Sequence, residues 1–317
     1  MRSHSNASSA LTFPSPETLV EALKMGLPEF GRIDWLGRTG STNADLIQRA
    51  READRSAHPA HDIATGVLFP DHTPWLRGAH LQTAGKGRAG RPWQNVAGQC
   101  LMFSCAFEPG IPLAQLPGIA PALGVATCHA LRSLLGHPPA LQLKWPNDLQ
   151  WEGSKLAGLL IETAPAVSAL TETTRGQPMI VMGMGLNLTG GAELSAHLQR
   201  PITDLSQIFQ SSALRRANLQ QTLTPATLVT HIARAWQQAL LDYKNNGYAA
   251  FAQAFSQVDA LADAFVQVND QGNILHEGLA QGTDSQGRLT ILTEAGIVSI
   301  LVGDISIRPG RDMKEKP

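Results

Sequence analysis

The chain has 317 residues, 43% of them hydrophobic, and its 25 basic and 26 acidic side chains leave a net charge of −1. At about 150 residues per domain, this length predicts two domains with a real core. The balanced charge excludes a general nucleic-acid binder, which is usually basic overall. No window approaches the roughly 18 apolar residues of a membrane span, and the polar start lacks the apolar stretch of a signal peptide. We therefore expect a soluble, cytoplasmic protein.

The first half of the chain is predicted to contain two helices, an irregular segment and two strands that flank a glycine-rich loop. Residues 1–13 are expected to be a disordered tail. Ser15, Pro16 and Gly26 are typical start and stop residues of a helix. The other predicted elements follow in chain order: a helix that starts at Ser41-Thr42-Asn43 and carries Leu46, Ile47 and Ala50, an irregular segment at 54–77, a strand from Gly78 to Thr83, a glycine-rich loop at 85–91, and a strand at Cys100–Phe107.

The second half predicts further strands, two helices and then a change of character. A helix is expected over Leu113–Leu135, with a break near Pro117 and Pro121. After about residue 264, short alternating runs between turn clusters predict a small β-barrel. The remaining predicted elements are strands at Ala140–Lys144, Lys155–Glu162 and Met179–Leu188, and helices at Thr224–Asn245 and Tyr248–Gln257.

The three cysteines, Cys100, Cys105 and Cys128, form no CxxC pair. They predict neither a disulfide framework nor a zinc ribbon, but small core residues in a reducing compartment. His58, His61 and His72 lack strong ligand spacing, so no protein metal site is expected.

The most distinctive motif is the run Gly85-Lys86-Gly87-Arg88-Ala89-Gly90, which satisfies G-x-G-x-x-G. A dinucleotide fold needs a helix directly after these glycines, but proline and glycine occupy that stretch. A P-loop is excluded because no Gly-Lys-Ser/Thr ends the run. What remains is a flexible loop with three cations, including Arg91. It is either a solvated hairpin tip or a site for phosphate or carboxylate.

Four other segments each allow a structural and a functional interpretation. Ser41-Thr42-Asn43 either caps a helix or offers free N–H groups to an anion. Lys144-Trp145-Pro146-Asn147-Asp148 is a turn, with or without a role in a site. Lys155, before the apolar run that contains Gly158, either snorkels or points at a ligand. Gly183-Met184-Gly185-Leu186-Asn187 by itself is typical of a tight turn.

Together and in this order, these five segments resemble the biotin–protein ligases, from about Trp35 to the end of the chain. The resemblance implies an α/β (α+β) fold, with a mixed-sheet catalytic domain at 14–263 and an SH3-like β-barrel at 264–317. It implies ATP-dependent activation of biotin to biotinyl-5′-AMP, with Mg²⁺ as cofactor. Biotin then passes to a lysine of the biotin carboxyl carrier protein of acetyl-CoA carboxylase. Fewer residues precede the matching region than a DNA-reading domain needs, so the resemblance implies a ligase-only form without DNA or membrane partners; a homodimer is one expected assembly.

The resemblance also implies roles for individual residues. The expected catalytic residues are Lys155, Arg88 and Asp148. Arg308 is a further candidate near the nucleotide. The residues expected to bind biotin or the adenylate are Ser41, Thr42, Asn43, Gln82, Gly85, Lys86, Gly87, Arg88, Arg91, Trp93, Lys155, Gly158 and Asn187. A lipoate or octanoate ligase or transferase, and a biotin-binding regulator, remain the alternatives.

Overall fold

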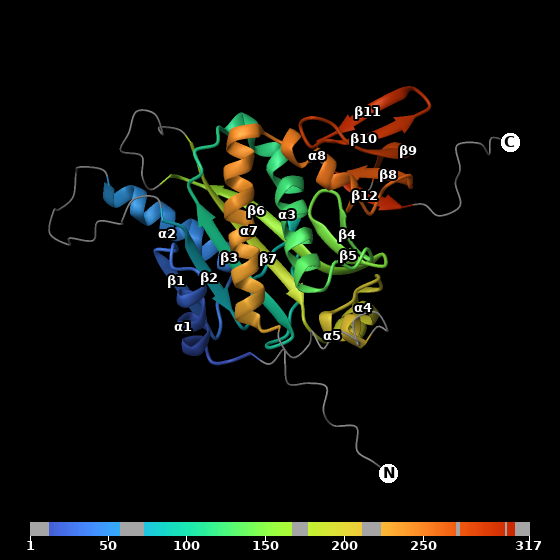
Figure 1. The fold of residues 1–317 in the computed structure, drawn as a ribbon. Helices are drawn as coiled ribbons and strands as arrows, with labels where there is room; N and C mark the ends of the chain where they lie inside the picture. Colours follow the sequence, from blue (N-terminus) through green and yellow to red (C-terminus); the bar gives the residue numbers. More distant parts are fainter. Residues whose placement is uncertain are drawn as a thin grey trace, which may run out of the picture.

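The structure is a computed structural model that describes residues 13–57, 73–166, 177–210, 223–270, 273–301 and 303–307. A large α/β part with a mixed sheet is followed by a smaller part built on a second sheet (Figure 1). Of the predicted segments, the tail at 1–13 lies outside the described residues except for its last position, and Arg308 also lies outside them.

The large part is organised around a seven-stranded sheet with the strand order β1-β2-β3-β7-β6-β5-β4. β1 and β2 run parallel, and the other neighbouring strands are antiparallel. The strands are β1 (Arg32–Leu36), β2 (Trp75–Ala79), β3 (Cys100–Phe107), β4 (Leu141–Lys144), β5 (Asp148–Trp151), β6 (Ser154–Ala164) and β7 (Met179–Asn187).

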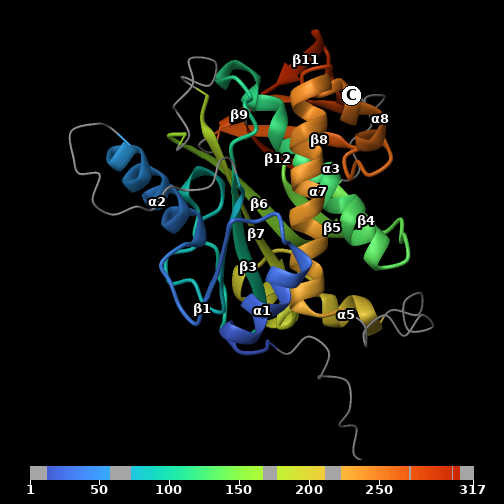
Figure 2. The same ribbon diagram turned by 60° about the vertical axis from the view of Figure 1, so that its left-hand side comes forward.

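Helices cover both faces of this sheet. α1, α3 and α7 pack together on one face, and α2 lies on the opposite face (Figure 2). Ser15 and Thr224 cap α1 and α7 through side-chain oxygens, and a proline follows each cap, which is the expected chemistry of a helix start. The helices are α1 (Pro16–Gly26), α2 (Thr42–Ala57), a 3₁₀ turn (Leu113–Gly118), α3 (Ile119–Leu134), α4 (Gly191–Leu198), α5 (Leu205–Gln210), α7 (Pro225–Asn246) and α8 (Ala249–Ser256).

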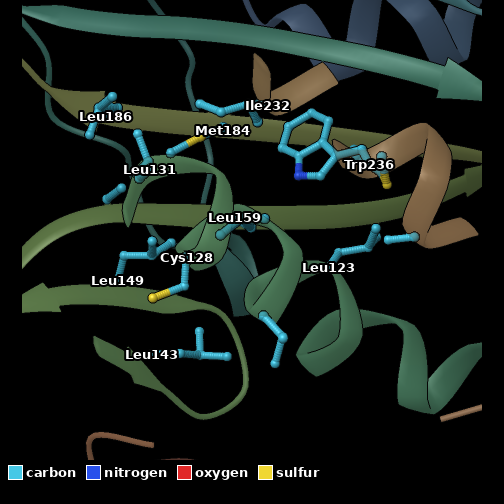
Figure 3. Packing of buried hydrophobic residues seen from close by; sticks show 14 of the residues in the cluster. Leu123, Cys128, Leu131, Leu143, Leu149, Leu159, Met184, Leu186, Ile232 and Trp236 are labelled. Atoms are coloured by element: carbon cyan, nitrogen blue, oxygen red, sulfur yellow. The ribbon is translucent and has the colours of Figure 1, made fainter. Parts of the chain in front are cut away.

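The main hydrophobic core fills the space between the sheet and α3 and α7 (Figure 3). Trp236 of α7 stacks on Phe103 of β3, with ring centroids 5.2 Å apart, and donates its indole N–H to Thr127 at 2.8 Å. A smaller core lies under α2, around Leu46, Ala50 and other buried side chains. Because successive strand residues point to opposite faces, β3 and β7 supply side chains to both cores.

The smaller part is a five-stranded antiparallel sheet with the order β11-β10-β9-β8-β12. It contacts the large part where Trp145 donates its indole N–H to the carbonyl of Gly287 at 2.9 Å. This sheet confirms the expected change to β structure after residue 264. Its strands are β8 (Phe265–Asp270), β9 (Asn273–Thr283), β10 (Leu289–Thr293), β11 (Gly296–Ile300) and β12 (Asp304–Ile307).

Several predicted boundaries were wrong. The segment 54–77 is not irregular throughout, because α2 continues to Ala57 and β2 already begins at Trp75. β2 ends at Ala79, so the strand predicted from Gly78 to Thr83 was placed too late. The polar composition around the apolar pair Trp75-Leu76 concealed this strand. Residues 58–72 lie outside the described residues.

Four elements were not predicted: β1, β5, α4 and α5. β5 has only four residues and follows an Asn-Asp pair that is typical of a turn, while α4 begins at a glycine. The break predicted near Pro117 and Pro121 is confirmed only in part, because a 3₁₀ turn that contains Pro117 gives way to α3 at Ile119, whereas Pro121 lies inside α3. In the described part of the chain, no helix is both long and apolar enough to cross a membrane.

Candidate active site

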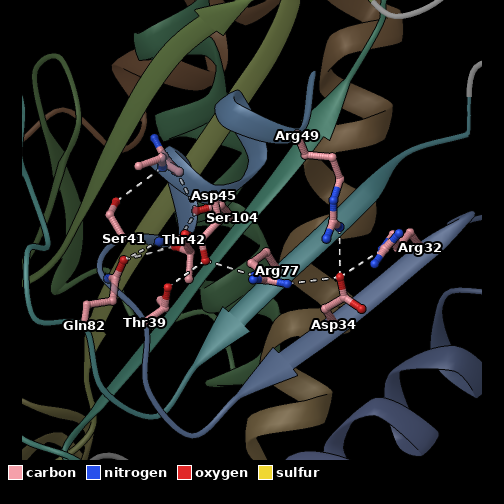
Figure 4. Close-up of polar contacts among 12 residues, drawn as sticks. Arg32, Asp34, Thr39, Ser41, Thr42, Asp45, Arg49, Arg77, Gln82 and Ser104 are labelled. Carbon is pink, nitrogen blue, oxygen red and sulfur yellow. Dashed lines mark hydrogen bonds and ion pairs between the residues drawn. The ribbon is translucent and has the colours of Figure 1, made fainter. Parts of the chain in front are cut away.

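The first wall of the site is the start of α2. The backbone N–H of Thr42 donates to Oε1 of Gln82 at 2.7 Å. The Thr42 hydroxyl lies 2.6 Å from the hydroxyl of Ser104 on β3, and the Ser104 hydroxyl donates to Oδ1 of Asn43 at 2.6 Å. Thr42, Asn43 and Ser104 are buried, and this polar chain fixes the helix start against the sheet (Figure 4).

Charged side chains hold the same helix from its flank. Asp45 of α2 accepts from Thr39 at 2.7 Å and from the guanidinium of Arg77 at 3.0 Å. Arg77 also bonds Asp34 of β1 at 3.2 Å, and Asp34 pairs with Arg49 of α2 at 2.9 Å. Figure 4 shows the two polar networks meeting at the first turn of α2. β1, β2 and α2 are therefore tied together beside the site.

Glycines hollow the sheet face that the start of α2 faces. Gly158 of β6 and Gly185 of β7 are directly paired in the ladder. A Cβ at Gly183 would overlap Oδ1 of Asn43, and one at Gly185 would overlap the ring of Trp93. These glycines therefore permit close approach of the site's walls rather than a tight turn. They lie within strands, which confirms the strand predicted over Met179–Leu188 and not the tight turn that the segment suggests by itself.

The glycine-rich loop closes over this hollow. The N–H of Gly87 donates to the carbonyl of Arg91 at 2.7 Å, and the N–H of Trp93 donates to that of Gly85 at 2.9 Å. Between them is a short turn in which Ala89 and Gly90 have φ angles of 53° and 71°, the left-handed region. The loop is thus folded back on itself, with Trp93 packed on β7.

Arg88 connects this loop to two distant parts of the chain. Its guanidinium donates to Oδ1 of Asn147 at 3.3 Å and to the carbonyl of Gly303 at 3.1 Å. Burial lowers the pKa of Arg88, and so does the charge of Arg91, while Asp148 opposes them. A guanidinium still remains charged under all ordinary conditions.

Lys155 and Asp148 form the opposite wall. Nζ of Lys155 lies 2.7 Å from Oδ1 of Asp148, and the two side chains are 20% and 28% exposed. The same Nζ lies 5.6 Å from the ring centroid of Trp93, within the range of a cation–π contact. The β5–β6 ladder has an irregularity beside this pair, where its register shifts between Leu149 and Gln150.

These walls enclose a cavity of about 140 Å³. Among the described residues that line it, the basic side chains outnumber the acidic ones, since Asp148 is the only carboxylate. The cavity is therefore electropositive and fitted to anionic groups. Its lining comprises Ser41, Thr42, Asn43, Gln82, Lys86, Gly87, Arg88, Arg91, Pro92, Trp93, Asn147, Asp148, Lys155, Gly158, Leu159, Leu160, Gly183, Met184, Gly185 and Arg200.

Most of the predicted site residues therefore lie together, and two lie beside the cavity. Gly85 lines an adjoining depression that is formed by the loop and the residues on both sides of it in the sequence. Asn187 is buried at the end of β7, where its amide donates to the carbonyl of Thr203 at 3.1 Å. The backbone N–H of Thr203 in turn donates to the backbone carbonyl of Lys155 at 3.0 Å. Through Thr203, Asn187 therefore supports the strand that carries Lys155.

Sequence reasoning missed Arg200, which lines the cavity, and Ser104 and Glu162, which hold its polar end. Arg200 follows a helix that was not predicted. Ser104 is a single polar residue inside a wholly buried strand. Buried polar side chains need hydrogen-bond partners, and that requirement was the available signal for Ser104.

The sheet is covered by helices, and the polar start of α2 faces a cationic loop across a hollowed part of the sheet. This arrangement is typical of an enzyme that binds anionic substrates. Residues 68–176 match the model of the biotin/lipoate A/B protein ligase family, and residues 266–308 match the biotin protein ligase C-terminal domain. The chain is 28% identical over 276 residues to the biotin–[acetyl-CoA-carboxylase] ligase of Mycobacterium tuberculosis, covering 86% of this chain and 88% of that protein.

Further relatives agree with this assignment. The bifunctional ligase/repressor BirA of Escherichia coli is 27% identical over 230 residues, which cover 73% of this chain and 65% of that protein. The biotin protein ligase of Aquifex aeolicus in complex with biotin and ATP has the same fold, with a TM-score of 0.62 at 23% identity over 88% of this chain and 99% of that chain. Over most of its length, the chain is therefore similar to the biotin protein ligases.

Proposed function

We propose that this protein is an ATP-dependent biotin–protein ligase. In the first step, a carboxylate oxygen of biotin attacks the α-phosphorus of ATP, and pyrophosphate leaves. In the second step, the amine of an acceptor lysine attacks the acyl carbon of biotinyl-5′-AMP, loses a proton, and AMP leaves. The observation that carries this proposal is that the polar start of α2, the cationic loop and Lys155 face one another across the same cavity.

The two ends of the cavity suit the two ends of an acyl-adenylate. At one end, the side chains of Ser41, Thr42 and Gln82 offer hydrogen bonds to the ring of biotin. At the other end, Lys155 and the cations of the glycine-rich loop face the negative charge of the carboxyl and α-phosphate groups. Fixed cations at the place where charge develops lower the barrier by electrostatic preorganisation. The loop also shields the adenylate from water.

Asp148 is the group that we assign to the transfer step. The ordinary pKa of a lysine amine is near 10.4, so the incoming nucleophile must lose a proton. Asp148 orients this amine or receives its proton, because it is the only carboxylate among the described residues that line the cavity. Its ion pair with Lys155 keeps the carboxylate beside the lysine that we assign to the carboxyl and α-phosphate groups.

The residues that the structure describes do not form a Mg²⁺ site of their own. Within the described ranges, no group of three or more His, Cys, Asp or Glu side chains is placed to hold a metal ion, and the cavity's carboxylate is already paired with Lys155. Mg²⁺ is commonly bound through substrate phosphates and water. We propose that the ion arrives with the phosphates of ATP, and we derive no step through it.

A thiol-based acyl transferase is disfavoured by the cysteines. Cys100, Cys105 and Cys128 are buried and free, and burial raises the pKa of the Cys100 and Cys128 thiols to about 12. A reactive thiol needs a lowered pKa and access to solvent. The match to a biotin protein ligase C-terminal domain favours biotin over lipoate.

The acceptor that we propose is the biotin carboxyl carrier protein of acetyl-CoA carboxylase, in the cytoplasm, where free cysteines persist. We assign catalysis to residues 14–263 and an accessory role to residues 264–317. Arg308 near the nucleotide and assembly as a homodimer are further parts of the proposal.

The test is isotope exchange between pyrophosphate and ATP in the presence of single acids. We expect exchange with biotin and none with lipoate or octanoate. Exchange with lipoate or octanoate but not with biotin would overturn the substrate assignment. Binding of biotin without any exchange would instead identify a passive binder or regulator.

A further inference from the structure

We infer that Glu162 of β6 sets the direction of a hydrogen-bond chain that makes Thr42 an acceptor toward the acyl substrate. This inference rests on the proposed function and concerns how the site selects its acid. Glu162 lies outside the cavity lining and is therefore a positioning residue. It acts through three side chains that are almost completely buried, Asn43, Ser104 and Thr42.

The direction of the chain follows from the number of protons that each group carries. A carboxylate only accepts, so Asn43 must turn its amide nitrogen, Nδ2, toward Oε2 of Glu162, at 2.8 Å. The carbonyl of Leu160 lies 3.4 Å from the same nitrogen, at the outer limit of a hydrogen bond, and favours this orientation only weakly. The amide oxygen of Asn43 therefore faces Ser104, whose hydroxyl donates to it at 2.6 Å.

The consequence reaches the cavity at Thr42. The only hydroxyl proton of Ser104 is used on Asn43, so Ser104 must accept from the hydroxyl of Thr42 at 2.6 Å. That contact takes the only hydroxyl proton of Thr42. Oγ1 of Thr42 also lies 3.2 Å from Oε1 of Gln82, which already accepts the backbone N–H of Thr42. The Thr42 hydroxyl could also donate to Gln82, but the contact to Ser104 is shorter by 0.6 Å, so the proton goes to Ser104 and Oγ1 of Thr42 keeps a lone pair to offer at the cavity.

This arrangement calls for an N–H donor on the ligand. The cyclic urea of biotin carries such donors, whereas the ring of lipoate and the tail of octanoate carry none. A ligand without the donor leaves the lone pairs of Thr42 unsatisfied in a buried place, which is the strongest basis for rejecting an analogue. Glu162 thus acts as a specificity determinant at a distance, through the orientation of Asn43.

The test compares Glu162→Gln, Ser104→Ala and the double variant, with Glu21→Gln on the exposed surface of α1 as matched control. The amide introduced by Glu162→Gln can donate as well as accept, so it no longer imposes one direction. We expect the Kd for biotin to rise about three- to tenfold in each single variant, as for the loss of one hydrogen bond. Desthiobiotin, which keeps the cyclic urea, should lose the same factor, and the KM for ATP should stay within about twofold.

The double variant should bind biotin no more weakly than the weaker-binding single variant, because both changes interrupt the same hydrogen-bond chain. Additive effects, equal losses for biotin and ATP, or an unchanged Kd in both single variants would overturn the inference. Circular dichroism checks that each variant is folded, and the isosteric Glu162→Gln serves if Ser104→Ala does not fold. Failure of the wild-type protein to bind biotin would instead refute the proposed function.

Discussion

Replacing Lys155 with alanine separates catalysis from stability most sharply. The substitution removes the 2.7 Å ion pair with Asp148 and the cation–π contact with Trp93. The ion pair is partly exposed, so its loss costs about 0.2–1 kcal/mol of unfolding free energy, and the ring contact adds about 0.5–1 kcal/mol. A domain with about 5–15 kcal/mol of stability remains folded after such a loss.

The expected effect on the chemistry is larger. Removing one preorganised group that faces developing charge costs about 100- to 1,000-fold in rate, or about 2.7–4 kcal/mol. Biotin-dependent exchange of pyrophosphate into ATP measures this first step directly, and urea unfolding measures stability. Lys24→Ala, on the exposed surface of α1, is the matched control and should change neither. Normal exchange in Lys155→Ala would refute the assignment of Lys155 to adenylate formation.

Three further outcomes are expected. Arg88→Gly removes the contacts to Asn147 and Gly303. The release rate of biotinyl-5′-AMP should therefore rise by a larger factor than the affinity for biotin falls. An unchanged release rate would show that Arg88 does not hold the adenylate. Gly185→Ala places a methyl group where it overlaps the Trp93 ring. It should lower the exchange activity strongly and the free energy of unfolding only slightly. Exchange at the wild-type rate would mean that the loop is free to shift. Burial raises the pKa of Asp259 from 3.8 to about 6; the folded state then holds the proton more tightly, so stability should fall by about 2–3 kcal/mol as pH rises from about 4 to 6. Asp259→Asn should abolish this fall in urea unfolding, and an identical pH profile in the variant would contradict the argument.

The parts of the site that were predictable are those with local signals. Glycines and cations cluster within a few residues at 85–91, and Ser41-Thr42-Asn43 precedes an amphipathic helix. Lys155 was recognisable as a charge at the mouth of an apolar strand. In each case the residue type contradicts its surroundings, which is the usual sign of a functional position.

The parts that were missed depend on register between distant strands. Ser104 meets Asn43 across 61 positions, and Glu162 meets the same residue across 119. The face of a strand on which each residue lies is set by pairing, and a shift of one position reverses it. The glycines at 183 and 185 were visible, but only the pairing of β7 with β6 reveals that they hollow a sheet rather than form a turn.

The measurement that tests the central claim most directly is mass spectrometry of a biotin carboxyl carrier domain after incubation with this protein, biotin and MgATP. The account predicts the mass gain of one biotin, located on a single lysine and dependent on ATP. An unmodified carrier in the presence of confirmed biotinyl-5′-AMP synthesis would contradict the proposed transfer, and modification without ATP would contradict the adenylate route.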